Sequence, residues 1–361
     1  NRIVNMKKGC FLLLVLLSLI YGYQGYKVVD TYVNDEIKIK TSGKLSDITE
    51  KVIPVLLETP DTGIVRHARH IRKDGNHLFM LSDNRLLHFD IHGNFINQIA
   101  SDIHEENDVF IAGYVLDTNA DQLFVIDSQR NIGKYDYDGN RISQSPIRHP
   151  WHTLSAMVFH NGYIWATAET LVKAEDTPDS YLIKNELFQL DTDMNILSKQ
   201  TLRIADTGRE RLFSGSCISE LLVDEEGVYA YSPPSHTEHL LKDTLYLAER
   251  KKIPYLYPDG PSGMACIYPV RKGQRHTMSM CNRPAGKKLT FCFDHENLTA
   301  YILPEGFKDD FFGTGHTNLH PMDIYNKSYC FIKSGKDLPK NILKNMVNEE
   351  QTILFILNPN A

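Results

Sequence analysis

The chain has 361 residues, and its 45 acidic and 39 basic residues give a formal net charge of −6. Charges are mixed along the sequence, which argues against duplex nucleic acid as a partner, because phosphate binding requires a clustered basic face. With 42% apolar residues, 22 glycines and 16 prolines, the composition is that of a globular protein and excludes a disordered or fibrous chain.

The N-terminal segment has the pattern of an export signal. Lys7 and Lys8 precede an apolar run from Cys10 to Ile20. As a helix this run spans about 16 Å, too short for a bilayer core of about 30 Å but typical of a signal peptide. We predict an upstream extension and signal peptide over residues 1–25 and an N-terminal leader segment over residues 26–44. A retained membrane-bound N-terminus is the alternative, and a lipid anchor is not expected because it needs a Cys just after the apolar run, whereas Cys10 lies at its start.

Five cysteines follow the predicted signal, and no two have the C-x-x-C spacing of a zinc or redox site. Most lie in apolar runs, where a cysteine usually behaves as a small buried hydrophobic residue. A disulfide between Cys281 and Cys292 is left open. The five residues are Cys217, Cys266, Cys281, Cys292 and Cys330.

Six short apolar runs recur along the chain, each after a polar turn. Their central residues are separated by 45, 41, 64, 49 and 52 positions. These residues are Phe79, Phe124, Trp165, Tyr229, Met278 and Cys330.

A second pattern follows the first in most repeats: an apolar residue, then Asp, then a turn rich in Gly and Asn. Asp and Asn bond to their own backbone and Gly accepts positive φ, so each copy predicts a hairpin. The copies are Phe89–Asn94, Tyr135–Asn140, Leu190–Asn195 and Phe293–Asn297.

The first two repeats each predict four antiparallel strands. In chain order the predicted strands cover residues 67–72, 78–81, 85–89 and 95–99, and then 110–116, 123–126, 132–135 and 141–143. Turns of helix are expected only near residues 44–50 and 340–348. Two longer segments, 167–184 and 232–242, are interpreted as insertions between repeats that could carry a protein partner or form plain surface loops.

Four-stranded units repeated six times predict an all-β fold, a six-bladed β-propeller over residues 45–361, with a β-sandwich as the alternative. The last repeat contains no fourth strand after Leu357. We therefore predict that an N-terminal strand within residues 52–57 completes this blade and closes the ring.

The segments Leu45–Ile48 and Ile53–Asp61, followed by the hairpin at Phe89–Ile96, resemble an exported six-bladed β-propeller family of Gram-negative bacteria related to NHL-repeat propellers. The resemblance implies the propeller fold and export to the periplasm or cell surface, and it implies no particular activity. The chain departs from the family at Ser101–Asn107, where a Gly-rich segment is common.

In a propeller, ligands usually bind at the channel mouth formed by the residues that lead into the innermost strands. These residues are polar here, and Trp151 could stack on a carbohydrate. A structural role at a wet surface is the alternative. The predicted ligand-binding residues are Arg66, His67, Trp151, His152, Ser216, His316 and Asn318.

The sequence shows little sign of covalent chemistry. It contains no Gly-x-Ser-x-Gly elbow, phosphate-binding loop or His-Glu-x-x-His motif. Closely spaced histidines such as His67 and His70 do not form a chelate when they lie on one strand. No catalytic residue, metal or cofactor is therefore predicted. The alternative is a lactonase-like hydrolase with Ca²⁺ held by Asp108, Asn318 and Asp323.

Together these observations predict an exported, monomeric, non-enzymatic binding protein. Its expected partner is a small polar molecule, a carbohydrate or a protein, held at the channel mouth.

Overall fold

The computed structural model describes most of the chain after residue 37. The described residues are 38–60, 63–100, 110–129, 131–145, 153–173, 181–206, 220–224, 227–231, 237–241, 247–252, 255–256, 265–266, 275–282, 288–294, 296–323, 327–339 and 350–359. The predicted signal peptide, the departure at residues 101–107 and the predicted helix near 340–348 lie outside these ranges. The chain forms two compact units, Asn1–Gly43 with Lys252–Phe307 and Lys44–Lys251 with Lys308–Ala361.

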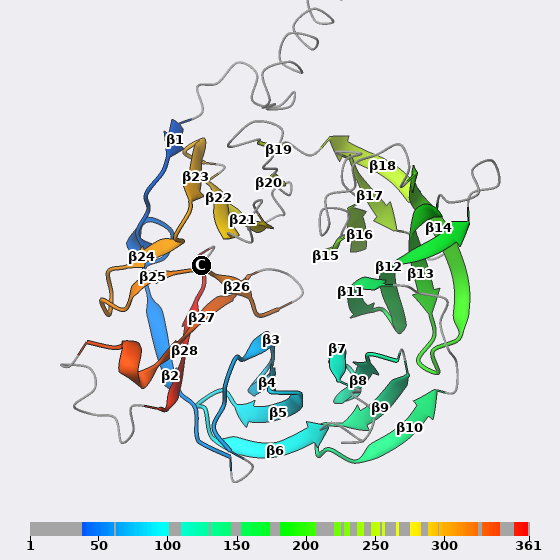
Figure 1. Ribbon diagram of the computed structural model, residues 1–361, viewed down its shortest axis with the longest axis horizontal. Coiled ribbons are helices and arrows are strands. Elements are labelled where there is room, and N and C mark those ends of the chain that lie inside the picture. Colours follow the sequence, from blue (N-terminus) through cyan, green and yellow to red (C-terminus); the bar gives the residue numbers. More distant parts are fainter. Residues whose placement is uncertain are drawn as a thin grey trace, which may run out of the picture. The chain divides into compact units, whose positions relative to one another are not determined.

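The larger unit contains five four-stranded sheets (Figure 1). The first sheet has β3 (Arg69–Asp74), β4 (His77–Ser82), β5 (Arg85–Asp90) and β6 (Phe95–Ala100). The second has β7 (Ile111–Asp117), β8 (Gln122–Asp127), β9 (Ile132–Asp136) and β10 (Arg141–Ser145). The third has β11 (Thr153–His160), β12 (Tyr163–Lys173), β13 (Tyr181–Leu190) and β14 (Ile196–Asp206), and the fourth β15 (Glu220–Asp224), β16 (Gly227–Tyr231), β17 (Thr237–Leu241) and β18 (Leu247–Lys252). The sheets are numbered by the sequence repeat that forms them, so the last sheet of the larger unit is the sixth. It has β2 (Val52–Leu56), β28 (Thr352–Leu357), β27 (Tyr329–Ser334) and β26 (His320–Pro321).

The fifth sheet belongs to the smaller unit and also has four strands. Its antiparallel strands are β21 (His276–Asn282), β22 (Lys288–Asp294) and β23 (Thr299–Leu303), and β1 (Lys38–Lys40) adds to β23 in parallel. The chain also contains two short two-stranded sheets. They are β19 (Tyr255–Leu256) with β20 (Ala265–Cys266) and β24 (Phe307–Asp309) with β25 (Gly315–Thr317).

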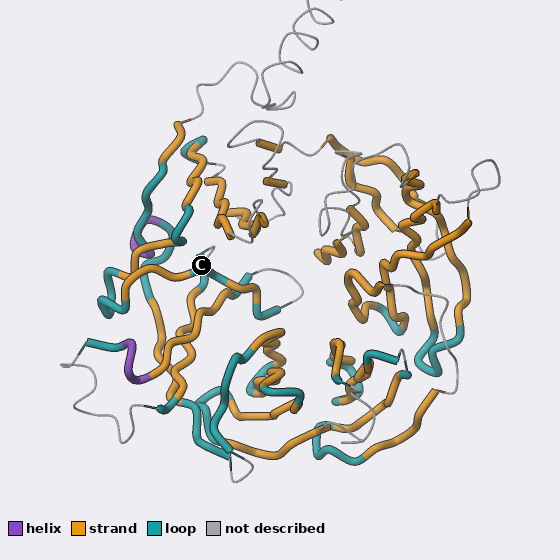
Figure 2. The backbone as a smooth tube through the Cα atoms, viewed as in Figure 1, coloured by secondary structure: helices purple, strands orange, loops and turns teal. Residues whose placement is uncertain are grey.

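Strands and short turns make up almost all of the described chain (Figure 2). The helical elements of these residues are single turns, η1 (Leu45–Asp47) and η3 (Gly335–Asp337). No helix among the described residues is long and apolar enough to span a bilayer.

The predicted strands of the first two repeats are confirmed to within about two residues at each end. The main difference is that β3 begins at Arg69, whereas the prediction began at His67. His67 has a φ of 47°, a left-handed conformation that cannot continue a strand.

The two predicted insertions are wrong, because much of each segment lies within a sheet. Residues 167–173 and 181–184 extend the β12–β13 hairpin, with Lys173 opposite Tyr181. In segment 232–242, β17 is the third strand of the fourth sheet. Polar residues in these segments suggested loops, but cross-strand pairing extends the ladder through them.

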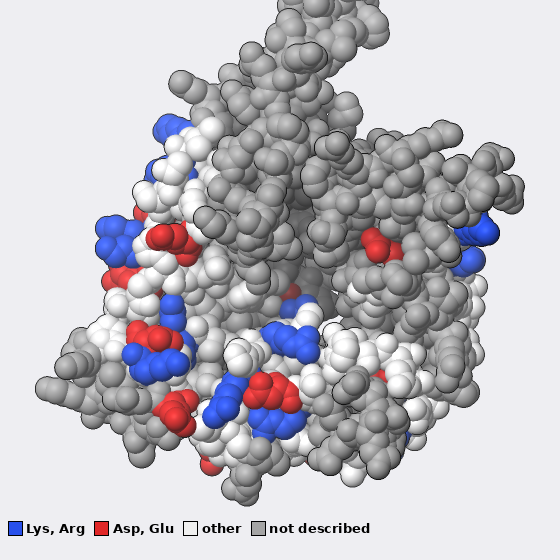
Figure 3. All heavy atoms as spheres, in the orientation of Figure 1, with Lys and Arg blue, Asp and Glu red and all other residues white. Residues whose placement is uncertain are grey.

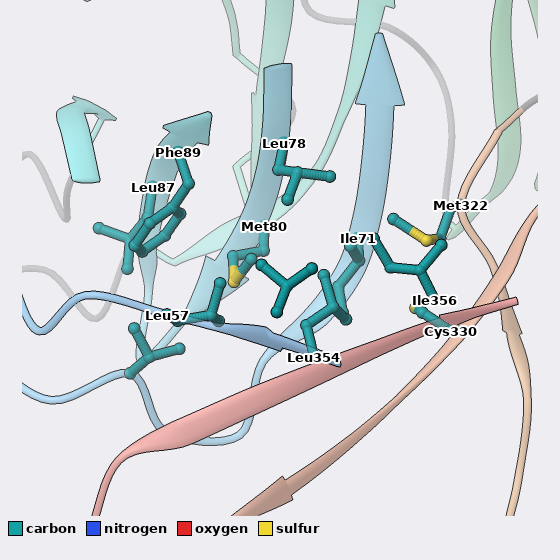
Figure 4. Close-up of a cluster of buried hydrophobic side chains, with 12 residues drawn as sticks. Leu57, Ile71, Leu78, Met80, Leu87, Phe89, Met322, Cys330, Leu354 and Ile356 are labelled. Carbon is teal, nitrogen blue, oxygen red and sulfur yellow. The ribbon is translucent and has the colours of Figure 1, made fainter. Parts of the chain in front are cut away.

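Neighbouring sheets of the larger unit pack face to face, because alternate residues of one strand point to opposite faces. Leu78 and Met80 of β4 join a core with the sixth sheet, whereas Phe79 and Leu81 join a core with the second sheet. Figure 4 shows the first of these cores, in which side chains of β3, β4 and β5 meet those of β27 and β28. Similar cores join the second sheet to the third and the third to the fourth.

This serial packing of five sheets in one unit distinguishes the fold from a β-sandwich, which has two. The fold class is therefore confirmed as an all-β propeller built from four-stranded blades.

The predicted hairpins are confirmed, and they share one set of hydrogen bonds. Asp90 Oδ1 accepts from Asn94 N at 2.9 Å, and Asp90 Oδ2 accepts from Asn94 Nδ2 at 2.6 Å. Asp136 and Asn140 repeat both bonds, at 2.7 and 3.0 Å. The same pattern occurs at Asp191–Asn195 and Asp294–Asn297. In the first three sheets the turn joins the third strand to the fourth, and in the fifth sheet it joins β22 to β23.

The predicted N-terminal closing strand is also confirmed. Strand β2 pairs antiparallel with β28, with Val52 opposite Leu357 and Leu56 opposite Ile353. The C-terminal strands alone supply three strands, so β2 completes the sixth sheet.

The disulfide left open between Cys281 and Cys292 is not formed. The register places Cys281 opposite Leu289 and Cys292 opposite Met278. Cys292 is a buried free thiol, and burial raises its pKa.

The β5–β6 turn holds the chain that follows β2. Glu58 N donates to Gly93 O at 2.8 Å, and Phe95 N donates to Glu58 Oε2 at 2.7 Å. Gly93 has a φ of 91°, and a Cβ atom there would lie 2.2 Å from Leu56 O. Only glycine fits this close approach.

We therefore predict that Gly93→Ala lowers the free energy of unfolding by roughly 3 kcal/mol or more, through backbone strain and the clash with β2. Gly75→Ala is the matched control, because Gly75 also has a positive φ of 52° but open space around it. It should cost only about 1 kcal/mol. Urea denaturation measures both, and equal losses would contradict the close approach.

Candidate functional site

The structure places four of the seven predicted ligand-binding residues, all of them in the larger unit. Arg66 and His67 lead into β3, while His316 on β25 and Asn318 lead into β26. Trp151, His152 and Ser216 lie outside the described residues. The two segments 66–68 and 316–319 are called the rim below.

Each rim segment contacts the end of the second strand in its own sheet. Ser82 Oγ accepts from Arg66 N at 2.9 Å and donates to Arg66 O at 2.8 Å. In the sixth sheet, Lys333 Nζ donates to His316 O at 2.8 Å. The two segments therefore occupy equivalent positions on their sheets, with exposed side chains at Arg66, His67 and His316.

The two sheets are neighbours at their first strands. Lys73 N donates to Met322 O at 2.8 Å, and Arg72 Nη1 donates to Pro321 O at 2.9 Å. The rim thus spans the start of two adjacent blades.

A group of basic residues follows the rim on the same two strands: Arg69, His70 and Arg72 of β3 and His320 of β26. We call it the cationic cluster. The β3–β4 register shifts between Arg69 and Arg72, so β3 contains a bulge there. His70 lies in this bulge with a left-handed φ of 48°. Bulges re-aim side chains, and backbone outliers of this kind gather at functional sites.

Strand β7 of the second sheet fixes the bulge from the other side. The buried Tyr114 hydroxyl lies 2.5 Å from His70 O and 2.9 Å from Phe79 O, and donates to these carbonyls. Arg69 Nη2 donates to Ile111 O at 3.3 Å. The bulge is therefore held by the strands on both of its sides.

The cluster carries positive charge although the chain as a whole is acidic. Figure 3 shows Lys and Arg atoms gathered over the first sheet, with a few acidic atoms between them. In the described part of the chain, the hydrogen bonds of Arg69 and Arg72 go to backbone carbonyls. Carbonyl dipoles orient a guanidinium but do not neutralise its charge.

His70 is neutral near pH 7. Its side chain is exposed, yet the surrounding protein desolvates it and, with the charge of Arg72, lowers its pKa to about 4. The charges of Arg69 and His320 act in the same direction.

Sequence reasoning selected Arg66 and His67 but passed over this cluster. Three basic residues within positions 69–72 could have indicated a cationic site. In a regular strand, however, neighbouring side chains point to opposite faces of the sheet. The bulge that changes this alternation has no clear mark in the sequence.

Of the three residues of the Ca²⁺-dependent alternative, the structure describes Asn318 and Asp323. Asp323 accepts hydrogen bonds from Lys327 N, from Ser328 N and from the Ser328 hydroxyl, so its carboxylate serves its own turn. Asp108 lies outside the described ranges. Among the described residues, no group of three or more His, Cys, Asp or Glu side chains could hold a metal ion.

A second polar cluster lies between the first two sheets and is fully used by the fold. His77 Nδ1 lies 2.8 Å from His88 Nε2, and His88 Nδ1 lies 3.0 Å from Tyr137 O. Because a carbonyl only accepts, His88 Nδ1 carries a proton and His77 donates to Nε2. Tyr137 OH donates to Asp74 Oδ2 at 2.8 Å. The network joins the sheets rather than presenting a ligand site.

We predict that His88 makes stability depend on pH. Burial, together with the charge of His77, lowers the pKa of His88 below 6.5, and the unfolded chain therefore binds this proton first. The contribution is complete above pH 6.5 and is lost as the pH falls through the lowered pKa. His88→Gln should flatten the decline in unfolding free energy below pH 6.5 by up to about 1.4 kcal/mol per pH unit.

Urea denaturation from pH 8 to pH 5 measures this slope. His92→Gln, at an exposed histidine of the β5–β6 turn, is the control and should leave the slope unchanged. Parallel profiles for the wild type and His88→Gln would show that His88 is not the group responsible.

Comparison with known proteins agrees with this architecture. A family model described as a 6-bladed β-propeller matches residues 27–215, more than half of the chain. A solved structure of a "Putative exported protein" from Bacteroides fragilis is 14% identical, with a TM-score of 0.58 over 89% of this chain and 99% of that one. Virginiamycin B lyase from Staphylococcus aureus is 10% identical, with a TM-score of 0.41 over 85% and 99% of the two chains. No curated protein matches the chain. At 14% identity, the Bacteroides structure shows a shared fold alone.

Proposed function

The chain belongs to the 6-bladed β-propeller family, and from this premise we propose that it is an exported, non-enzymatic protein that binds a small polar molecule or carbohydrate at the rim. Export is supported by the signal-like pattern of residues 6–25 and by the description of the Bacteroides structure. Periplasm and cell surface are both compatible with it.

The observation that carries the proposal is the set of polar groups at the start of β3 and β26. Apolar cores fill the faces between the sixth, first and second sheets, so a ligand would meet the protein at the strand ends. Exposed Arg66, His67 and His316 offer hydrogen bonds there. The bulge at His70 is built and fixed beside them.

We predict that the full chain is stabilised by at least one member of a panel of neutral sugars, sugar acids, amino acids and sugar phosphates. A ligand at 100 times its Kd adds about 2.7 kcal/mol to the unfolding free energy. Thermal unfolding identifies the ligand, and calorimetry then gives its Kd. Trp151→Ala and His316→Ala should each weaken binding about tenfold or more.

His92→Ala is the matched control, because His92 is exposed on the turn between β5 and β6, at the other end of the strands from the rim. It should bind as the wild type does. The proposal fails if no member of the panel binds, or if both rim variants retain wild-type affinity. A protein that binds with the same sensitivity to His316→Ala, in place of any panel member, would also overturn the small-ligand assignment.

A further inference from the structure

In the cationic cluster, the hydrogen bonds that the described residues make with Arg69 and Arg72 do not neutralise the charge of the two arginines. Arg69 reaches β7 through one bond from Nη2, and Arg72 reaches β26 through Nη1. A guanidinium has five N–H donors, so each arginine is oriented by the protein and keeps further donors for another group. Among the described residues, the partners of these bonds are carbonyls and include no carboxylate.

Hydrogen bonds also fix the β3 bulge on which the cluster lies. The Tyr114 hydroxyl holds His70 O, and the two arginine bonds fasten the bulge to both neighbouring innermost strands. Arg69 and Arg72 lie on the same strand as His70, and each guanidinium can form the planar, bidentate hydrogen bonds that carboxylate and phosphate oxygens accept.

We infer that the cationic cluster of Arg69, His70, Arg72 and His320 binds an oxyanion, the carboxylate or phosphate group of the ligand held at the rim. The inference rests on the proposed binding function and narrows its ligand class to acidic or phosphorylated small molecules. A neutral ligand would leave the two guanidinium charges without a counter-charge.

His70 then couples binding to protons. The groups that face it are Arg69 and Arg72 on its own strand, His320 on β26 and the neutral phenol of Tyr114 on β7. An anion placed among them favours the protonated ring, so it raises the pKa of His70 from its lowered value. Binding of an acidic ligand therefore takes up protons and strengthens as the pH falls from 7 to 5.

Calorimetry on the full chain tests this with matched probes: glucose, glucuronate and glucose 6-phosphate, and the corresponding galactose series. We expect an acidic member to bind at least about tenfold more tightly than its neutral parent. The carboxylate and phosphate arms distinguish the two oxyanions. Arg69→Gln with Arg72→Gln should remove the preference, whereas Arg69→Lys with Arg72→Lys should keep most of it.

Arg141→Gln on β10, the fourth strand of the second sheet, is the control for loss of one positive charge and should retain the preference. If the double glutamine variant does not fold, the affinities of Arg69→Gln alone and of the wild type for the acidic and neutral sugars still test the oxyanion assignment. Titrations of the wild type in two buffers of different protonation enthalpy count the protons taken up between pH 5 and pH 6.

Equal binding of the neutral and acidic forms would overturn the oxyanion assignment and leave the binding function intact. Tighter binding of the neutral form, or acidic binding without proton uptake, would also overturn it. Failure of every probe and every panel member to bind would reject the proposed function itself.

Discussion

The constraint on which this structure depends is that the first, second and third blades each bury both of their faces. A strand such as β4 sends Leu78 and Met80 into one core and Phe79 and Leu81 into the next, so neither face can carry a charge without a buried partner. The sequence must then be apolar in continuous runs rather than in alternation. Residues that bind a ligand must therefore lie outside these cores, at the strand ends and in the segments that lead into the strands.

Polar groups in the two kinds of position behave differently. Between the sheets, His77, His88 and Tyr137 satisfy one another and nearby oxygens, and the network is closed. On β3, Arg69 and Arg72 donate only to carbonyl groups among the described residues, and these partners do not neutralise the charge of the two arginines. Both environments keep a histidine neutral, but only the second leaves donors for a molecule from outside.

Much of the fold could be predicted because its signals are local. The Asp–Asn turns carry their own hydrogen bonds, and the missing last strand followed from counting strands after residue 329. The parallel addition of β1 was not predicted, since three exposed residues give no periodic pattern. Prediction of the site was less complete. Arg66, His67, His316 and Asn318 were selected by their place before a strand, and their binding role stays a prediction, whereas the environment of His70 depends on a bulge and on charges from another strand.

The two N-terminal strands impose an order of assembly. Residues 38–40 pair with residues 299–301, and residues 52–56 pair with residues 353–357. Both strands leave the ribosome first, yet their partners are made some 260 to 300 residues later, and closing loops of that length is entropically costly. Until then β1 and β2 expose unpaired backbone edges, so two of the sheets remain open to mispairing for most of synthesis. A chaperone that shields the nascent N-terminal segment would act on this interval.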